Sequence, residues 1–339
     1  MRPAAPVRLA WRPRDSAARI AAAAALSAVC AAALVALSGH DPLAAAVALA
    51  QGAAGSPHQI GVALNRATPY LLAGGGVALC FRAGVVNVGA EGQIALGGAG
   101  AAAAAAMWPG ADVIAALLVA SLCGAVWAGV ATAIHLGRRV HEVLATLLLN
   151  FVALLGVQQA LSGALGQKGA GFLQSPPLSP AFWLAKLPAF GVHAGFALAL
   201  GLAGASSFVL WRTPFGFSLR VAGASRRAAA YAGFSRARTT WSVMGIAGAL
   251  AGLAGGVEVL GVHHRLIDGF STGFGFKAVT VALLGAREPL AVVPAALAVG
   301  FLETGGQAMQ RQIGVPSALV VVIEGLTMLF VLAAAARRP

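Results

Sequence analysis

Amide and carboxyl side chains gathered at residues 82–93 are the part of the sequence best suited to binding a polar solute. Asn87, Glu91 and Gln93 stand among apolar residues, where an ionisable side chain is costly and normally faces a cavity or a partner. If the segment is helical, Asn87 and Glu91 share one face and can exchange hydrogen bonds with a polyhydroxylated solute. The alternative is a buried network that holds two helices together. Glycines interrupt the segment, and interrupted helix is tolerated in lipid only where protein or a water-filled cavity satisfies the backbone: Gly84, Gly89 and Gly92.

A second glycine-rich segment, residues 268–277, precedes another apolar run. Phe274 and Phe276 can offer faces for stacking on a sugar ring or a base, or they can pack in lipid or the protein core. The two segments open the third and eighth predicted helices, which run in opposite directions. That placement is expected of inverted repeats with discontinuous helices around a midplane site.

Further polar residues are scattered through the apolar stretches. Asn150 is a third candidate for the wall of a solute pathway. Glu303 and Glu324 have no basic partner nearby in the sequence, and proton-coupled transporters also carry isolated carboxylates. The residues therefore leave a second hypothesis open, a proton-coupled secondary transporter of a small polar solute with Glu303 or Glu324 as the relay.

The composition places these residues in a membrane protein. The 339-residue chain is 59% hydrophobic and 10% charged, against about 25% charged for a typical globular chain. Basic residues give a net charge of +13, but they lie between long apolar stretches, which indicates topology signals and not a nucleic-acid surface. The cysteines stand alone in apolar runs and predict neither a disulfide framework nor a metal site: Cys30, Cys80 and Cys123.

Apolar stretches of about 20 residues predict an all-α polytopic membrane protein with about ten transmembrane helices. The proline-rich segment 167–188 divides them into two inverted-like halves of five. Glycine stripes predict close helix contacts, at positions that include Gly97, Gly245, Gly248, Gly252 and Gly255. The predicted spans are 17–38, 60–81, 85–107, 111–135, 142–163, 190–211, 239–261, 266–285, 289–309 and 315–336.

Arginine placement predicts the orientation, because basic loops stay in the cytoplasm. We expect a cytoplasmic basic N-terminus at 1–16, a transmembrane domain at 17–336 and a cytoplasmic loop at 212–238 within it. Both chain termini are then cytoplasmic. The loop predicts a short helical hairpin in which Ser225 caps a helix from Arg226 to Ala232 and Gly233 ends it. Such a basic loop can dock into a soluble partner or rest on anionic lipid.

The sequence motifs give no support to an enzyme. No Gly-Lys dipeptide occurs, so the chain has no Walker A loop and any ATP-driven step needs another polypeptide. His-Glu-x-x-His and Cys-x-x-Cys motifs do not occur either.

Three segments in register resemble bacterial ABC-importer permeases of the nucleoside and simple-sugar group, which are relatives of the ribose and branched-chain amino acid permeases. The segments are 84–93, 141–150 and 216–233, and the resemblance covers about 67–332. The form Asn-x-Gly-x-Glu-Gly-Gln at 87–93 favours the nucleoside type.

The resemblance implies a permease subunit that imports nucleosides or simple sugars across the bacterial plasma membrane, without an ATPase site of its own. It implies three partners: an ABC ATPase that binds ATP and Mg, a second homologous permease, and a lipid-anchored or periplasmic substrate-binding protein. It implies no nucleic-acid partner and no cofactor held by this chain. The choice of solute, and of homodimer or heterodimer, stays open.

The same resemblance implies that the loop 212–238 enters a groove of the ATPase. The pair Ala228-Ala229 followed by Gly233 has the EAA-x3-Gly spacing of importer permeases, with Arg227 where the glutamate would stand. Closure of the ATPase would move this loop and rock the helices around a cavity near Asn87 and Glu91. The expected coupling residues are Arg220, Gly223, Ala228, Ala229 and Gly233.

Overall fold

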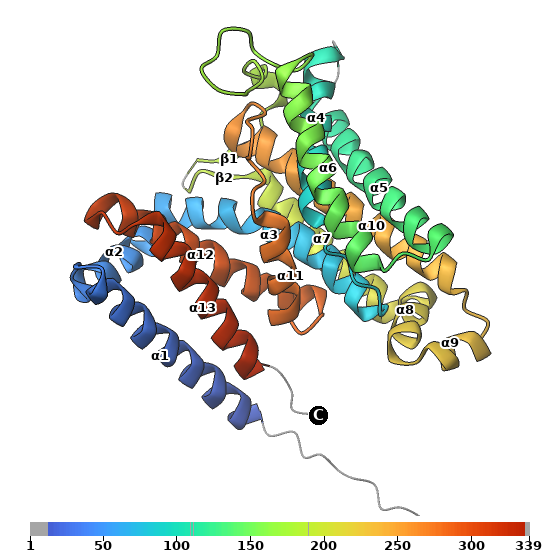
Figure 1. Cartoon of the computed structure of the whole chain (residues 1–339), viewed down its shortest axis with the longest axis horizontal. Helices are drawn as coiled ribbons and strands as arrows, with labels where there is room; N and C mark the ends of the chain where they lie inside the picture. Colours follow the sequence, from blue (N-terminus) through green and yellow to red (C-terminus); the bar gives the residue numbers. More distant parts are fainter. Residues whose placement is uncertain (1–12, 109, 111, 189, 336–339) are drawn as a thin grey trace, which may run out of the picture.

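The computed structural model describes residues 13–108, 110, 112–188 and 190–335, which form a helical bundle (Figure 1). A two-residue antiparallel hairpin joins β1 (Lys186–Leu187) to β2 (Val192–His193). The helices are α1 Pro13–Leu37, α2 Pro42–Ala54, α3 Pro57–Arg82, α4 Ala90–Met107, α5 Val113–Arg138, α6 Glu142–Ser162, η1 Pro180–Phe182, α7 Ala194–Arg212, α8 Pro214–Ala224, α9 Arg226–Tyr231, α10 Arg236–Glu258, η2 Val259–His263, α11 Phe274–Leu284, α12 Pro289–Ile313 and α13 Ser317–Ala335.

Six helices of the described chain are long and apolar enough to cross a membrane: α5, α6, α7, α10 with its π-helical continuation η2, α12 and α13. The prediction of about ten spans is therefore not confirmed. The clearest difference is α11, which has 11 residues where a full span was expected at 266–285. At a rise of about 1.5 Å per residue, α11 covers roughly half of a bilayer core of about 30 Å. Gly273 has φ +88° directly before α11, and this left-handed backbone ends the turns that precede the helix.

Helix α2 was not predicted from the sequence. Asp41 caps its N-terminus by accepting a hydrogen bond from the Leu43 amide, and Pro42 occupies the first turn. With 13 residues it is too short for the span length used to read the sequence. It packs on α12, where Gly52 lies directly against Ala308. Helix α1 begins at Pro13, so most of the basic segment expected at 1–16 lies outside the described residues.

The two ends of the bundle differ in character (Figure 1). The start of α1, the end of α13 and the α8–α9 hairpin lie at one end, which we call the hairpin end. The long connection between α6 and α7 lies at the other. This connection is tied to the α10–α11 link, because the amides of Ser175 and Leu178 donate to the carbonyls of Leu266 and His264. The arrangement agrees with an even number of crossings between α1 and α13.

Glycines bring α10 into backbone contact with α4 and α5. A Cβ added to Gly252 would overlap the Ala120 carbonyl of α5, and one added to Gly97 of α4 would overlap the backbone of Gly252. Gly255 lies equally close to the Ile94 carbonyl. Lipid supplies no hydrophobic drive between helices, so this close approach and its dispersion contacts hold the three helices together. The predicted stripe is confirmed except at Gly245, which has no neighbour within 4 Å of its Cβ position.

We expect Gly252→Ala to lower the stability of the detergent-solubilised protein by about 1–3 kcal/mol, because its methyl group forces α10 away from α5. Gly245→Ala is the matched control on the same helix and should leave stability unchanged or slightly higher, since its methyl group meets open space. Thermal midpoints from fluorescence-detected size exclusion measure both. Equal midpoints for the two variants would show that the α10 contact does not carry the fold.

Candidate solute pathway and coupling loop

The predicted third span does not start as a helix. Residues 85–88 are non-helical and α4 begins only at Ala90, so Asn87 and Glu91 do not share a helical face as the sequence suggested. Helix α3 ends in a glycine cap at Gly84, which has φ +71°, with the Val85 amide donating to the Cys80 carbonyl. The chain then turns toward α4 through Asn87, whose side-chain oxygen accepts from the Gly89 amide at 2.9 Å.

Asn87 and Gln93 are completely enclosed and bond to each other. Asn87 Nδ2 donates to Gln93 Oε1 at 3.2 Å, and Gln93 Nε2 donates to Asn87 Oδ1 at 3.3 Å. Neither side chain is more than 1% exposed. The structure thus gives both residues a partner inside the protein, six residues away in the same stretch of chain. Contact of either residue with a solute stays a prediction.

Glu91 joins the two glycine-rich segments that the sequence singled out. Its Oε1 accepts from the Gly273 amide at 3.0 Å and its Oε2 accepts from the Gly275 amide at 2.7 Å. These amides begin α11 and have no partner within their own helix, so the carboxylate acts as their cap. A Cβ on Gly275 would overlap the Glu91 backbone, so only glycine lets the two helix starts come this close.

Helix α6 holds the non-helical residues 85–88 with a row of polar side chains. Glu142 Oε1 accepts from the Val86 amide at 3.1 Å, and Thr146 Oγ1 accepts from the Val88 amide at 3.4 Å. Asn150 Oδ1 accepts from the Gly92 amide and its Nδ2 donates to the Val88 carbonyl, both at 2.9 Å. Asn150 was predicted as a pathway residue, whereas Glu142 and Thr146 were missed. Their spacing of four residues was the available signal.

The two phenylalanines of α11 face different surroundings. Phe274 is buried, with its ring 5.5 Å from that of Tyr70 in an edge-to-face contact. Phe276 is 43% exposed and is the predicted pathway residue that lies open at the surface of the described chain. Stacking on a solute is therefore sterically available to Phe276 and not to Phe274 in this conformation.

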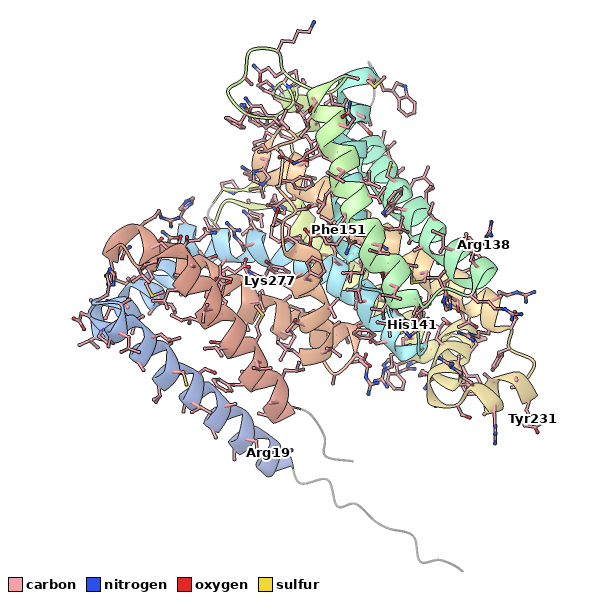
Figure 2. All side chains as sticks on the ribbon, viewed as in Figure 1. Arg19, Arg138, His141, Phe151, Tyr231 and Lys277 are labelled. Carbon is pink, nitrogen blue, oxygen red and sulfur yellow. The ribbon has the colours of Figure 1, made fainter. Side chains whose placement is uncertain are left out.

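A partly buried ionic cluster lies beside these aromatic residues. Lys277 of α11 forms ion pairs with Glu303 of α12 and Glu324 of α13, and Tyr70 of α3 donates to Glu303 at 2.6 Å. Lys277 is labelled in Figure 2, and its side chain is 29% exposed, whereas both carboxylates are buried. Sequence reasoning missed this lysine, because its partners are 26 and 47 residues away. Both carboxylates have a cationic partner, so they are not the isolated carboxylates on which the proton-relay alternative depended.

The loop 212–238 forms the predicted helical hairpin, α8 and α9. Ser225 caps α9 by accepting from the Ala228 amide at 3.3 Å, and Gly233 follows with φ +77°. Ala229 is buried, whereas Tyr231 is 93% exposed and stands at the tip of the hairpin in Figure 2. The predicted cap, helix and stop are confirmed, and the hairpin presents an accessible helix at one end of the bundle.

Two contacts anchor this hairpin to the bundle. A Cβ on Gly223 would overlap the Arg82 carbonyl, so α8 rests directly on the end of α3. The Arg220 guanidinium lies 4.6 Å from the centre of the Trp211 ring, and Trp211 Nε1 donates to Glu288 at 2.9 Å. Arg82 completes the group with an ion pair to Glu288 at 3.3 Å. Both Gly223 and Arg220 were predicted as coupling residues; Trp211 and Glu288 were not.

A cavity of about 740 Å³ opens at the hairpin end, between the ends of α3, α11 and α13. Arg82 and Glu288 from the anchoring group lie on its wall. Its charged lining residues, Arg82, Arg287 and Glu288, suit an aqueous mouth. The other lining residues are Phe81, Gly84, Val85, Val86, Leu283, Ala286 and Leu332.

These features define a class: a multi-pass helical membrane protein with broken helices at its centre and a hairpin exposed at one end. The chain belongs to the family described as the permease component of the branched-chain amino acid transport system, whose model matches residues 59–332. It is accordingly a membrane transport subunit of an ABC transporter and not a catalytic enzyme. Members of this family work in general with an ABC ATPase and a substrate-binding protein.

Several curated proteins are similar over most of the chain. A guanosine ABC transporter permease protein of Bacillus subtilis is 32% identical over 302 residues, which cover 87% of each chain. A glucose ABC transporter permease protein of Haloferax volcanii is 35% identical over 288 residues, 79% of this chain and 74% of the relative. A nucleoside ABC transporter permease protein of Lactococcus lactis is 26% identical over 86% of this chain and 84% of the relative. No solved structure matches the chain significantly.

We expect Glu91→Gln to destabilise the protein by about 1–3 kcal/mol, because the new amide group cannot accept from one of the two glycine amides and leaves it unsatisfied. Asp268→Asn is the matched control, since Asp268 is exposed and makes a side-chain bond only to Gln158. Thermal midpoints of the purified variants give the comparison. A midpoint for Glu91→Gln equal to that of wild type would mean that the carboxylate does not hold the helix starts together.

Proposed function

We propose that the chain is one of two permease subunits of an importer in a bacterial plasma membrane, and that it carries nucleosides or simple sugars inward. The substrate class is supported by relatives named for guanosine, nucleosides and glucose. In this proposal ATP and Mg bind to a separate ATPase, and a lipid-anchored or periplasmic protein delivers the solute. Both chain termini and the α8–α9 hairpin then face the cytoplasm.

The observation that carries the proposal is the direct contact between the hairpin and the end of α3, from which the chain leads into α4. Gly223 touches the Arg82 carbonyl, and the chain continues from there through residues 84–89 into α4. A protein that binds the exposed face of α9 and moves the hairpin would thus also move the end of α3. The start of α4 lies only a few residues further along the chain. Ala228 and Gly233 keep the exposed face of α9 small for that partner, because small residues permit close approach, while the buried Ala229 faces the bundle.

For the pathway itself we propose a division of roles. Asn87, Glu91, Gln93 and Asn150 brace the helix starts from within, and Phe274 packs behind them. Phe276 supplies an exposed ring against which a base or a sugar ring can stack. The cavity between α3, α11 and α13 is the cytoplasmic mouth of this pathway, and the second permease completes the enclosure.

Replacement of Gly223 tests the coupling role. The complex copurified with the tagged chain is placed in proteoliposomes and assayed for ATP hydrolysis and for uptake of guanosine, ribose and glucose. We expect Gly223→Leu to lower uptake at least about tenfold while ATP hydrolysis continues, because the side chain displaces α8 from α3. Gly137→Leu is the matched control at the same end of the bundle, where nothing lies within 4 Å. Unchanged uptake in Gly223→Leu would count decisively against the proposal, as would a wild-type complex without an ATPase.

A further inference from the structure

We propose that Glu142, Thr146 and Asn150 of α6 are positioning residues that make the non-helical segment 84–89 a mechanical link between the α8–α9 hairpin and the α4–α11 junction. The inference rests on the proposed function, since it assumes that the hairpin is moved by an ATPase. It assigns to α6 a role that differs from solute contact.

Segment 84–89 has no helix of its own to satisfy its backbone. Non-helical backbone within a membrane protein persists only where other protein groups or the water of a cavity satisfy it. Glu142, Thr146 and Asn150 lie four residues apart and therefore share one face of α6. Between them they accept from three amides of the segment and its continuation and donate to one carbonyl. Segment and helix are consequently bound to move together.

The segment is in direct contact with the hairpin. Gly84, at the beginning of the segment, lies against the backbone of Gly223 of α8, and Gly223 in turn lies against the Arg82 carbonyl. Backbone touches backbone here without an intervening side chain. A packed contact of this kind transmits displacement, because neither side can be compressed.

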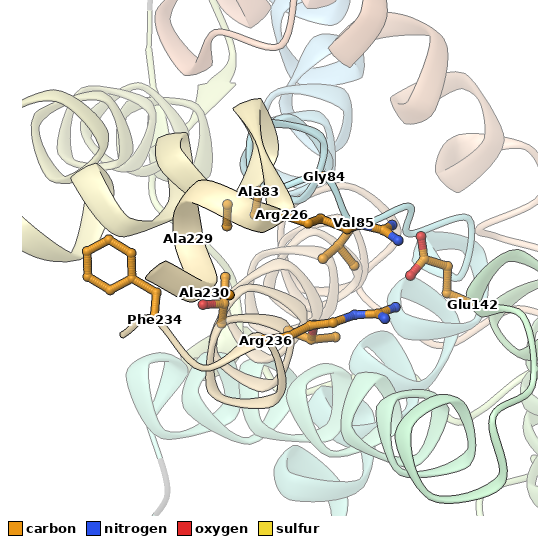
Figure 3. Close-up of a pocket in the computed structure, with 12 residues that line it drawn as sticks. Ala83, Gly84, Val85, Glu142, Arg226, Ala229, Ala230, Phe234 and Arg236 are labelled. Atoms are coloured by element: carbon orange, nitrogen blue, oxygen red, sulfur yellow. The ribbon is translucent and has the colours of Figure 1, made fainter. Parts of the chain in front are cut away.

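A cavity of about 320 Å³ lies next to this contact (Figure 3). Gly84, Val85 and Glu142 line it on one side, and Ala229 and Ala230 of the hairpin line it on the other. Arg226 and Arg236 point across it toward Glu142. The cavity gives the hairpin room to move against the bundle.

Charged side chains at the edge of this cavity form a second connection between the loop 212–238 and α6. The carboxylate of Glu142 is 3.5 Å from His135 Nε2, and the Arg236 guanidinium at the start of α10 lies 3.5 Å from the same nitrogen. Glu142 thus bonds to the segment through one oxygen and faces the hairpin's basic flank through the other. Movement of the hairpin alters the surroundings of the residue that holds Val86.

Hydrogen bonds connect the segment and α6 to the starts of α4 and α11. Asn150 holds the Gly92 amide, and the neighbouring Glu91 holds the first amides of α11. A shift of segment 84–89 therefore reaches both helix starts through hydrogen bonds and not through a flexible loop. The side chains of α6 decide whether the shift is transmitted or absorbed.

The test is the number of solute molecules imported per ATP hydrolysed by the reconstituted complex. Thr146→Val keeps the shape and removes the acceptor for the Val88 amide. We expect this ratio to fall about three- to tenfold, the equivalent of one hydrogen bond, with the KM for solute unchanged. Thr132→Val is the matched control: Thr132 is equally buried, but it bonds only to Ala128 of its own helix. Its ratio should equal that of wild type.

A second variant keeps the test decisive if Thr146→Val fails to assemble. Asn150→Asp retains the acceptor for the Gly92 amide and loses the donor to the Val88 carbonyl, so it should also lower the ratio while the complex stays assembled. A folded Thr146→Val or Asn150→Asp complex with a wild-type ratio would overturn this inference but leave the proposed function standing. A wild-type complex that hydrolyses no ATP or imports no solute would overturn the proposed function, and the inference with it.

Discussion

The carboxylate of Glu91 satisfies the constraint on which the centre of this protein depends. Two helices, α4 and α11, begin inside the bundle, and the amides at a helix start have no partner in their own helix. Water is not available at membrane depth to satisfy them. Glu91 lies in the first turn of α4 and accepts from the amides of Gly273 and Gly275, so one side chain fixes both starts against each other. The glycines around it follow from the same constraint, since a Cβ on Gly275 would meet the Glu91 backbone.

The rest of the bundle is arranged to hold these broken helices in place. Helix α10 packs on α4 through glycine contacts. The polar side chains of α6 form hydrogen bonds with the backbone of the non-helical segment and of the first turn of α4. On the far side of α11, Lys277 ties it to α12 and α13. An ion pair inside a membrane protein is costly unless it is well partnered, and here one ammonium faces two carboxylates and a tyrosine hydroxyl bonds to one of them.

Sequence reasoning predicted what local physics determines. The long apolar helices were placed within a few residues, and the cap of α9 was correct, because Ser225 and Gly233 act within one turn. The glycine stripe on α10 was also readable from composition. The short length of α11 was missed, since hydropathy does not register the turns that precede Gly273. The Lys277 cluster and the bonds of Asn150 could not be foreseen, because they join residues whose proximity is set by packing.

Hydrogen exchange of the reconstituted complex, measured by mass spectrometry, tests most directly whether the hairpin and the central helix starts move as one unit. Peptides that cover 212–238, 84–92 and 271–277 are compared between the nucleotide-free complex and the complex trapped with a non-hydrolysable ATP analogue. The structure predicts that exchange changes together in all three, because hydrogen bonds and backbone contacts connect them. A change confined to 212–238, with the amides at 84–92 and 271–277 unaffected, would contradict the account.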